Sequence, residues 1–587
     1  MTPLRRLLGY FARYKRSLAL GAACVIGSAA FSLIKPLIIG GAVDTLSGNF
    51  TRGTLVRYGL MLIGAAAVEG LFLYLQRWIL IGMSRHIEYD MRNDFYQHLQ
   101  RLPLGYYHGQ RTGDLMSRAT NDLASTRMLI GPGVMHSISA LLVVTGSFIM
   151  MVRIDLSMAL VALLAVPVVG GMAKYFGENI HVRSKAVQDY FGDISARVQE
   201  NLAGVRVVRA FTREQSEIDS FKRMNHQFVE RNRSLIRLNA TFHPTLHALV
   251  GVMFVFVFYF GSRKLIDGTM TIGSFVAFQF FLGRLIWPLI ALGWVINLFQ
   301  RGMASMKRLH EVWSVEPAGD PVGDPSVDHT ASTPEAPLST ADLEIRDLTF
   351  SYGHRNVLRD IDLTVEHGQT IGIVGRTGSG KSTLLQLITR AFEPPPGTIF
   401  VAGRPIETIP MRELREWIGM VPQETFLFSE SIAENIRFGR AGATDAEVDE
   451  AADQAGLTSD VATFSDGLRT VIGERGITLS GGQKQRTAIA RALVRDPMML
   501  ILDDSLSAVD THTEERILNA LRRIRKGRTV LIVSHRVSSV KDADHIVVLD
   551  DGAIVERGTH EALLEKGGYY ADLYRRQTIE AELEETA

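Results

Sequence analysis

Six apolar runs in the first 300 residues constrain the fold of this chain more than any other feature of its sequence. A helix needs about 20 apolar residues to cross the hydrocarbon core of a bilayer. Each run is near that length, and residues 246–261 form the least clearly bounded of them. The runs predict an α-helical membrane domain over residues 17–313. Its six spans are expected at residues 17–43, 55–83, 134–152, 156–172, 246–261 and 272–299.

The two halves of the 587-residue chain carry opposite net charges. Residues 1–340 hold 34 Lys and Arg against 23 Asp and Glu, a net of +11, whereas residues 341–587 hold 29 against 39, a net of −10. The basic residues of the first half flank the apolar runs, which is typical of the cytoplasmic loops of membrane proteins. Because they form no single basic patch, nucleic-acid binding is not expected. The single cysteine, Cys24, excludes an intramolecular disulfide.

The N-terminal segment sets the expected orientation. Residues 1–16 contain five basic residues and no acidic one, which predicts a cytoplasmic N-terminus. Their apolar residues recur at helical spacing, so this segment is predicted to be an interfacial helix on the membrane surface. Six spans then return the chain to the cytoplasm, with long inner loops at 84–133 and 173–245. Both loops read as helical extensions, and the turns expected at Tyr106–Thr120 and Ala210–Phe221 could dock on a cytoplasmic domain.

Four charged residues fall inside the predicted spans, namely Lys35, Glu69, Arg77 and Arg284. Charge inside a membrane is costly and marks a functional site by default. Glu69 and Arg284 lie deepest and are expected to line a polar substrate cavity, to which Trp287 adds an aromatic face. The alternative for Trp287 is helix packing or lipid contact, and Arg77 fits the inner membrane interface equally well.

The second half of the chain predicts a P-loop NTPase domain of α/β fold. Residues 314–342 are rich in Pro, Asp, Ser and Thr and read as a linker, residues 343–580 alternate β-rich and helical stretches, and residues 581–587 form a tail. A strand expected at Thr370–Val374 runs into a glycine-rich loop and then a helix, which is the context that a phosphate-binding loop requires. The expected nucleotide-binding residues here are Gly375, Thr377, Gly378, Ser379, Gly380, Lys381, Ser382 and Thr383.

A second apolar strand, MMLILDD, ends in two carboxylates. Asp503 is placed to hold Mg²⁺ together with the Ser382 hydroxyl. Asp504 occupies the next position, where a general base for the attacking water would lie.

A third motif is Leu479, Ser480, Gly481, Gly482 and Gln483, ahead of a helix predicted at Gln485–Val494. Small residues before a helix N-terminus form a second phosphate cradle. Because the domain already has one P-loop, this cradle is expected to act on a nucleotide bound to another subunit.

With these motifs the chain resembles an exporter-type ABC half-transporter, in which six membrane spans are fused to one nucleotide-binding domain. The resemblance implies that Tyr352 stacks on adenine, that Gln423 contacts Mg²⁺, and that His535 contacts the γ-phosphate. It also implies that Ser507, Ala508 and Asp510 lie at the dimer interface. The segments Thr112–Asp122 and Gly473–Gly476 resemble regions that couple the two domains. The catalytic set is then Lys381, Asp504 and His535, with ATP and Mg²⁺ as ligands.

The chain departs from the family at Asp504, where most members have Glu. The side chain is one methylene shorter, and losing a well-placed general base costs about 10²–10⁴-fold in rate. The sequence therefore favours one half of a heterodimeric exporter that has a weak ATP site. The alternatives are a regulatory ATP-binding subunit with little turnover and a homodimeric exporter in which Asp504 is a working base.

The expected function is ATP-driven export of amphipathic or hydrophobic drugs or lipids by alternating access. The expected partners are a second half-transporter, membrane lipids and the substrate, and the expected location is a bacterial inner membrane. Neither the substrate nor the choice between heterodimer and homodimer follows from the sequence, and the direction of transport rests on the resemblance alone.

Overall fold

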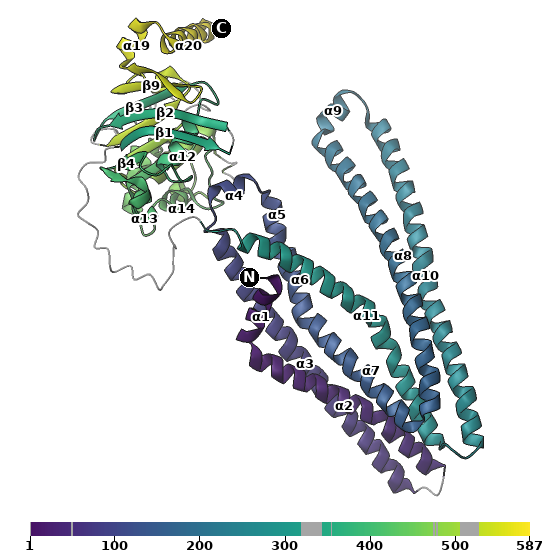
Figure 1. The fold of residues 1–587 in the computed structure, drawn as a ribbon. Coiled ribbons are helices and arrows are strands. Elements are labelled where there is room, and N and C mark those ends of the chain that lie inside the picture. Colours follow the sequence, from purple (N-terminus) through teal and green to yellow (C-terminus); the bar gives the residue numbers. More distant parts are fainter. Residues whose placement is uncertain are drawn as a thin grey trace. The chain divides into compact units, whose positions relative to one another are not determined.

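A computed structural model describes residues 2–47, 51–317, 343–353, 355–473, 476, 479–504 and 528–586 of the chain. Most of the predicted linker 314–342 and the expected interface residues Ser507, Ala508 and Asp510 lie outside the described residues. The chain divides into two compact units (Figure 1). One comprises residues 1–100 and 110–316, and the other comprises residues 101–109 and 317–587.

The first unit consists of long helices. Five of them are long and apolar enough to cross a membrane, and they contain five of the six predicted spans. The remaining run, 156–172, begins helix α8, where several side chains lie outside the described set. The helices are α1 (Pro3–Arg13), α2 (Lys15–Leu46), α3 (Arg52–Leu99), α5 (Thr112–Ser117), α6 (Leu123–Met128), α7 (Val134–Ile154), α8 (Leu156–Ala203), α9 (Val205–Ala210), α10 (Glu214–Ile266) and α11 (Ile272–Trp313).

These helices extend well beyond a bilayer. Helix α3 has 48 residues and α10 has 53, which at 1.5 Å per residue gives about 70–80 Å. Helices α8 and α10 lie side by side and are joined through α9 (Figure 1). The turn expected at Ala210–Phe221 is shorter than predicted, because α10 already begins at Glu214. Helix α2 packs on α3, and α11 packs on α2 and α7.

The N-terminal segment forms α1, as its spacing predicts. Leu7 and Tyr10 are buried, while Leu4 and Leu8 are exposed, so the helix presents two faces of different burial. The Tyr10 hydroxyl donates to Asp94 of α3 over 2.6 Å, and the Tyr14 hydroxyl donates to Asp90 over 3.0 Å. These bonds fix α1 against the C-terminal part of α3.

The second unit is the predicted α/β domain with two sheets. The four-stranded antiparallel sheet has the order β2-β1-β4-β5, and the six-stranded sheet has the order β10-β9-β3-β8-β7-β6, in which only β10 is antiparallel to its neighbour. The strands are β1 (Leu343–Tyr352), β2 (Arg355–Val365), β3 (Thr370–Gly375), β4 (Ile399–Val401), β5 (Arg404–Pro405), β6 (Ile418–Val421), β7 (Met499–Asp503), β8 (Thr529–Ser534), β9 (His545–Asp550) and β10 (Ala553–Gly558).

The central strands are buried on both faces, which explains their continuous apolar sequences. Ile501 of β7 joins an apolar core with β1, β2 and α12, whereas Leu500 and Leu502 join a second core with α14, α15 and α17. The helices of this unit are α4 (Leu104–His108), α12 (Lys381–Ile388), α13 (Met411–Trp417), α14 (Ile432–Arg437), α15 (Asp445–Gln454), α16 (Thr458–Val461), α17 (Gly481–Leu493), α19 (His560–Lys566) and α20 (Tyr569–Thr586).

Candidate functional site

The loop between β3 and α12 has the geometry of a cradle. A Cβ at Gly375 would lie 2.1 Å from the carbonyl oxygen of Leu549, so no larger residue fits there. Gly378 and Gly380 have φ values of +86° and +102°, a region that other residues rarely adopt. Thr377 is exposed on the outer turn, and Thr383 is half-buried in the first turn of α12. The glycines therefore allow a tight turn at a helix N-terminus, where backbone N–H groups favour an anion.

Lys381 lies in the centre of this loop. Its Nζ donates to the carbonyl oxygens of Gly375 and Arg376 over 2.7 and 2.8 Å. Burial lowers the pKa of Lys381 from its ordinary value, while the nearby carboxylates oppose that shift. The buried hydroxyl of Ser379 has no hydrogen-bond partner among the described residues. An ammonium group and an unpartnered hydroxyl inside one glycine loop fit a bound phosphate group.

The Ser382 hydroxyl and Asp503 approach each other at the mouth of the loop. Ser382 Oγ lies 3.4 Å from Asp503 Oδ1, and the Asp503 side chain is nearly buried at the end of β7. A hydroxyl and a carboxylate are the oxygen ligands that Mg²⁺ takes in phosphate-binding sites. The donor set therefore fits a magnesium ion held beside the phosphates.

Burial raises the pKa of Asp503 above its ordinary value of 3.8, and the charge of Asp504 adds to the rise. Because a carboxylate must be ionised to hold Mg²⁺, its protonation competes with the metal. We expect Mg²⁺-dependent ATP affinity to fall with decreasing pH, starting at a higher pH than for an ordinary carboxylate. Titrating Mg²⁺ against fluorescent ATP at several pH values measures this. Asp503→Asn is the control, and its weak affinity should lack this pH dependence; an unchanged profile would contradict the assignment.

Asp504 is held by two residues that the resemblance singled out. His535 Nδ1 lies 2.8 Å from a carboxylate oxygen of Asp504, and Gln423 Nε2 donates to that carboxylate over 3.3 Å. The Asp504 residue is 8% exposed and has a φ of +43°, and its N–H donates to the carbonyl of Val533 on β8. The structure thus brings Asp504, His535 and Gln423 together beside Asp503, as the sequence motifs imply.

Tyr352 lies near the loop, at the end of β1. Its ring is 43% exposed and its hydroxyl donates to Gln386 of α12 over 3.1 Å. The ring packs edge-on against Phe392, with 5.1 Å between the ring centroids. An exposed aromatic face at this point is suited to stacking on a nucleobase.

The Leu479–Gln483 motif forms the start of α17. Ser480 caps this helix, because its hydroxyl accepts from the N–H of Gln483 and the Gln483 side chain accepts from the N–H of Ser480. The helix starts at Gly481, four residues before the predicted start. This is because the capping box provides hydrogen-bond acceptors for backbone N–H groups at the helix N-terminus. Gly481 and Gly482 are thus at a 13-residue helix N-terminus, and Leu479 is buried. Of the neighbouring Gly473–Gly476 segment, only the two glycines are among the described residues.

The first inner loop is helical. Thr112–Asp122, which resembles a region that couples the two domains, forms α5 and a π-helical turn within the helical unit, and its coupling role stays a prediction. Helix α4, just before it, belongs to the α/β unit. There Gly105 packs against the ring of Phe392, and the His108 ring lies 5.7 Å from it. The Pro103 residue before α4 ends the preceding helical path and so allows this separate short helix.

Phe392 thus touches both Tyr352 and α4, a role that no sequence motif marked. We expect Phe392→Ala to loosen α4, because an aromatic pair contributes about 0.5–1.5 kcal/mol. Limited trypsin cleavage at Arg101 and Arg111, which flank α4, should become about five-fold faster. Phe426→Ala, at an exposed aromatic of the same unit, is the matched control. Equal cleavage rates in all three proteins would contradict this packing role.

The charges inside the membrane half are partly paired. Lys35 of α2 forms an ion pair with Glu69 of α3, and the Arg284 guanidinium donates to the Ser32 hydroxyl. The buried Ser28 and Gln76 side chains are hydrogen-bonded to each other nearby. These contacts link α2 to α3 and α11, and they place Glu69 and Arg284 in interhelical contacts.

Trp287 is 72% exposed on α11, one turn from Arg284. A cavity of the helical unit, described below, is lined by none of Glu69, Arg284 and Trp287. That cavity is therefore distinct from the expected substrate cavity, which stays a prediction.

Two family models match the chain, one over the helical unit and one over the α/β unit. The ABC transporter transmembrane region matches residues 18–289, and the ABC transporter model matches residues 358–507. A probable multidrug resistance ABC transporter ATP-binding/permease protein of Bacillus subtilis, YheI, is 36% identical over 98% of both chains. The chain belongs to the ABC transporter family. It is an exporter-type half-transporter, and it hydrolyses ATP to drive transport across a membrane.

Other relatives support the same class. The multidrug resistance-like ATP-binding protein MdlA of Escherichia coli is 35% identical over 99% of this chain and 97% of its own length. An ATP-dependent lipid A-core flippase of Syntrophus aciditrophicus is 32% identical over 98% and 95%. A solved bacterial Atm1-family ABC exporter with ATP bound has a TM-score of 0.77 at 26% identity, covering 96% of this chain and 99% of the other.

Proposed function

We propose that this ABC half-transporter forms a heterodimer in which its own P-loop site hydrolyses ATP slowly. The single observation that carries the proposal is Asp504. Its carboxylate is one methylene shorter than that of the usual Glu and is already engaged by His535 and Gln423, 2.8 and 3.3 Å away. ABC exporters of this kind work as dimers, so the Leu479–Gln483 motif of this chain would complete the second, competent site on its partner.

The residues of this chain would act mainly by positioning and charge. The loop glycines and Ser379 bind the phosphates, and Lys381 exchanges its two carbonyl partners for phosphate oxygens. Tyr352 offers its exposed face to the base. His535 would contact the γ-phosphate, and Asp504, directly after β7, would be the candidate base.

Ser382, Asp503 and Gln423 would hold a magnesium ion, which when bound neutralises phosphate charge. The oxygens of Ser382 and Asp503 approach each other at the mouth of the loop, and Gln423 lies beside Asp504. The chain's contribution is to fix Ser382 at the start of α12, Asp503 at the end of β7 and Gln423 just after β6.

The proposed substrates are amphipathic or hydrophobic molecules such as drugs or lipids. The names of the relatives, which refer to multidrug resistance and to a lipid flippase, support this class. The proposed location is a bacterial inner membrane with the N-terminus and the α/β unit in the cytoplasm, supported by the basic residues 1–16.

Two other functions follow if Asp504 behaves differently. A regulatory subunit would bind ATP and gate its partner with almost no turnover. A homodimeric exporter would need no partner and would use Asp504 as a working base. The shortened side chain at position 504 is the reason for preferring the heterodimer to the homodimer.

Steady-state ATPase activity of the purified chain alone in lipid nanodiscs tests the proposal, with Lys381→Ala as the blank. We expect ATP binding with turnover near the blank. Turnover of about 1 s⁻¹ or faster, within the ordinary enzyme range, would show that a homodimer forms and that Asp504 is an adequate base. Adding a half-transporter that carries Glu at this position should restore turnover under the heterodimer proposal, and failure of every such partner would favour the regulatory subunit.

A further inference from the structure

A cavity runs along the middle of α3 and includes Arg77 but none of Lys35, Glu69 and Arg284. It has a volume of about 930 Å³ and includes Ser17 of α2. Its other lining residues all come from residues 70–86 of α3, a length of about 24 Å. None of the lining residues is acidic, whereas Arg77, Arg85 and His86 are basic.

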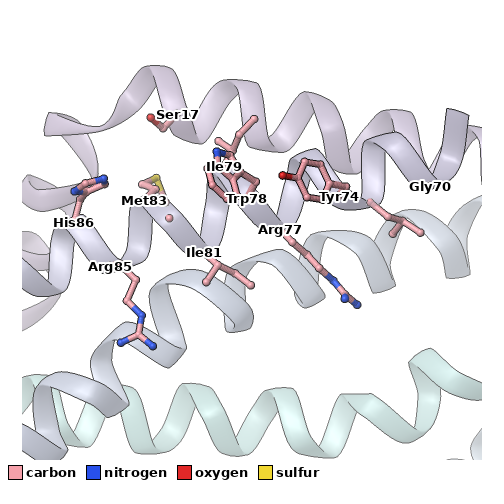
Figure 2. Close-up of a pocket in the computed structure, with 12 residues that line it drawn as sticks. Ser17, Gly70, Tyr74, Arg77, Trp78, Ile79, Ile81, Met83, Arg85 and His86 are labelled. Atoms are coloured by element: carbon pink, nitrogen blue, oxygen red, sulfur yellow. The ribbon is translucent and has the colours of Figure 1, made fainter.

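The two ends of this cavity differ in chemistry. Gly70, Leu73 and Tyr74 line one end, and Arg85, His86 and Ser17 line the other. Figure 2 shows the guanidinium groups of Arg77 and Arg85 extending to the same side of α3, with the aromatic side chains of Tyr74 and Trp78 beside Arg77. A long cavity that is apolar at one end and cationic at the other fits an amphiphile with an anionic headgroup.

Helix α1 indicates the depth of the cavity in the membrane. Its two-faced sequence is that of a helix lying at a membrane surface. Tyr14, at the end of α1, stacks on His86 with 6.2 Å between ring centroids, so His86 lies near the level of that surface. Arg77 is nine residues further into the bilayer, about 13 Å along the helix. Trp78 and Tyr74, 70% and 60% exposed, are of the type enriched at this interface.

The positive charge beside the cavity exceeds what the chain neutralises. Glu88 is buried and has three arginines within ion-pair distance, at 3.1 Å for Arg85, 2.9 Å for Arg92 and 3.3 Å for Arg127. Arg77 is exposed on α3, and no ion pair joins it to another described residue. An arginine at this depth is costly unless an anion accompanies it.

We propose that this cavity binds an anionic phospholipid of the inner leaflet. Arg77 and Arg85 hold the phosphate, and an acyl chain lies along Leu73 and Tyr74. Basic pockets between helices on the cytoplasmic side are suited to such headgroups. The site is independent of the assignment of the ATP sites, so its test leaves the proposed function open either way.

Native mass spectrometry of the full-length protein, released from nanodiscs of equal phosphatidylglycerol and phosphatidylcholine, tests this site. We expect wild type to retain phosphatidylglycerol selectively. Each arginine near an anionic headgroup contributes about five-fold, so the double variant Arg77→Gln/Arg85→Gln should lose up to about 25-fold of that preference. The double variant Arg77→Lys/Arg85→Lys should keep most of it, and Arg57→Gln, at an exposed arginine near the other end of α3, should keep all of it.

Three outcomes would overturn the proposal. Equal retention of both lipids by wild type would show that the cavity does not select charge. Displacement of the lipid by glycerol 3-phosphate at equal concentration would show a site for free phosphate. Loss of selectivity once the protein is assembled with a partner half-transporter would show that a partner helix covers the cavity.

Discussion

Replacing Asp504 by Glu is expected to raise ATP turnover at this chain's own P-loop site by about 100-fold. His535 and Gln423 engage the short carboxylate of Asp504 in the structure, and the added methylene is expected to let a carboxylate at this position reach an attacking water. A well-placed general base contributes about 10²–10⁴-fold, and the lower end applies because the rest of the site is already positioned. Single-turnover hydrolysis in the assembled complex measures the effect at this site.

The neighbouring carboxylate supplies the matched control. Asp503→Glu adds the same methylene at the position that faces Ser382, so it should lower turnover by disturbing the metal donors. If Asp504→Glu leaves turnover unchanged while Asp503→Glu lowers it, the weak-site proposal is wrong and Asp504 is an adequate base.

The sequence predicted the parts of the site that depend on local order. The loop Gly375–Gly380 lies between β3 and α12, and Asp503 ends β7. Both could be predicted because parallel strands that are buried on both faces appear in the sequence as apolar runs, with functional residues at their carboxyl ends. The position of His535 beside Asp504 follows from the pairing of β7 with β8, which no local pattern encodes. The resemblance supplied that residue where the sequence pattern could not.

The contacts between distant segments were not predictable. Helix α4 was hidden inside a charged loop, and its packing on Phe392 joins residues almost 300 positions apart. The pairing of Lys35 with Glu69 was equally invisible, because hydropathy shows that a charge lies in a span but not which face of the helix carries it. From the sequence, Arg77 fits either a snorkelling residue or a residue at the membrane interface. Its surroundings become clear only when α1 and the cavity along α3 are considered together.

Replacing Lys381 by Ala is expected to weaken ATP binding to this chain by about 100-fold and to abolish its hydrolysis. The substitution removes the one ammonium group inside the loop, whose two hydrogen bonds of 2.7 and 2.8 Å also tie Nζ to the loop backbone. Charge-assisted hydrogen bonds are worth about 1.5–3 kcal/mol each, so losing them at the phosphates accounts for a change of this size. Equilibrium binding of a fluorescent ATP analogue measures the affinity apart from turnover.

Lys541→Ala removes the same charge from an exposed position of the same unit and serves as the control. Thermal unfolding without nucleotide separates a loss of affinity from a loss of fold, since the Lys381 side chain contributes only local loop contacts to the apo protein. Wild-type affinity in Lys381→Ala would remove the phosphate-binding role from this loop. The proposal for Asp504 would then also lose its basis, because a weak site requires that ATP first be held by the loop beside it.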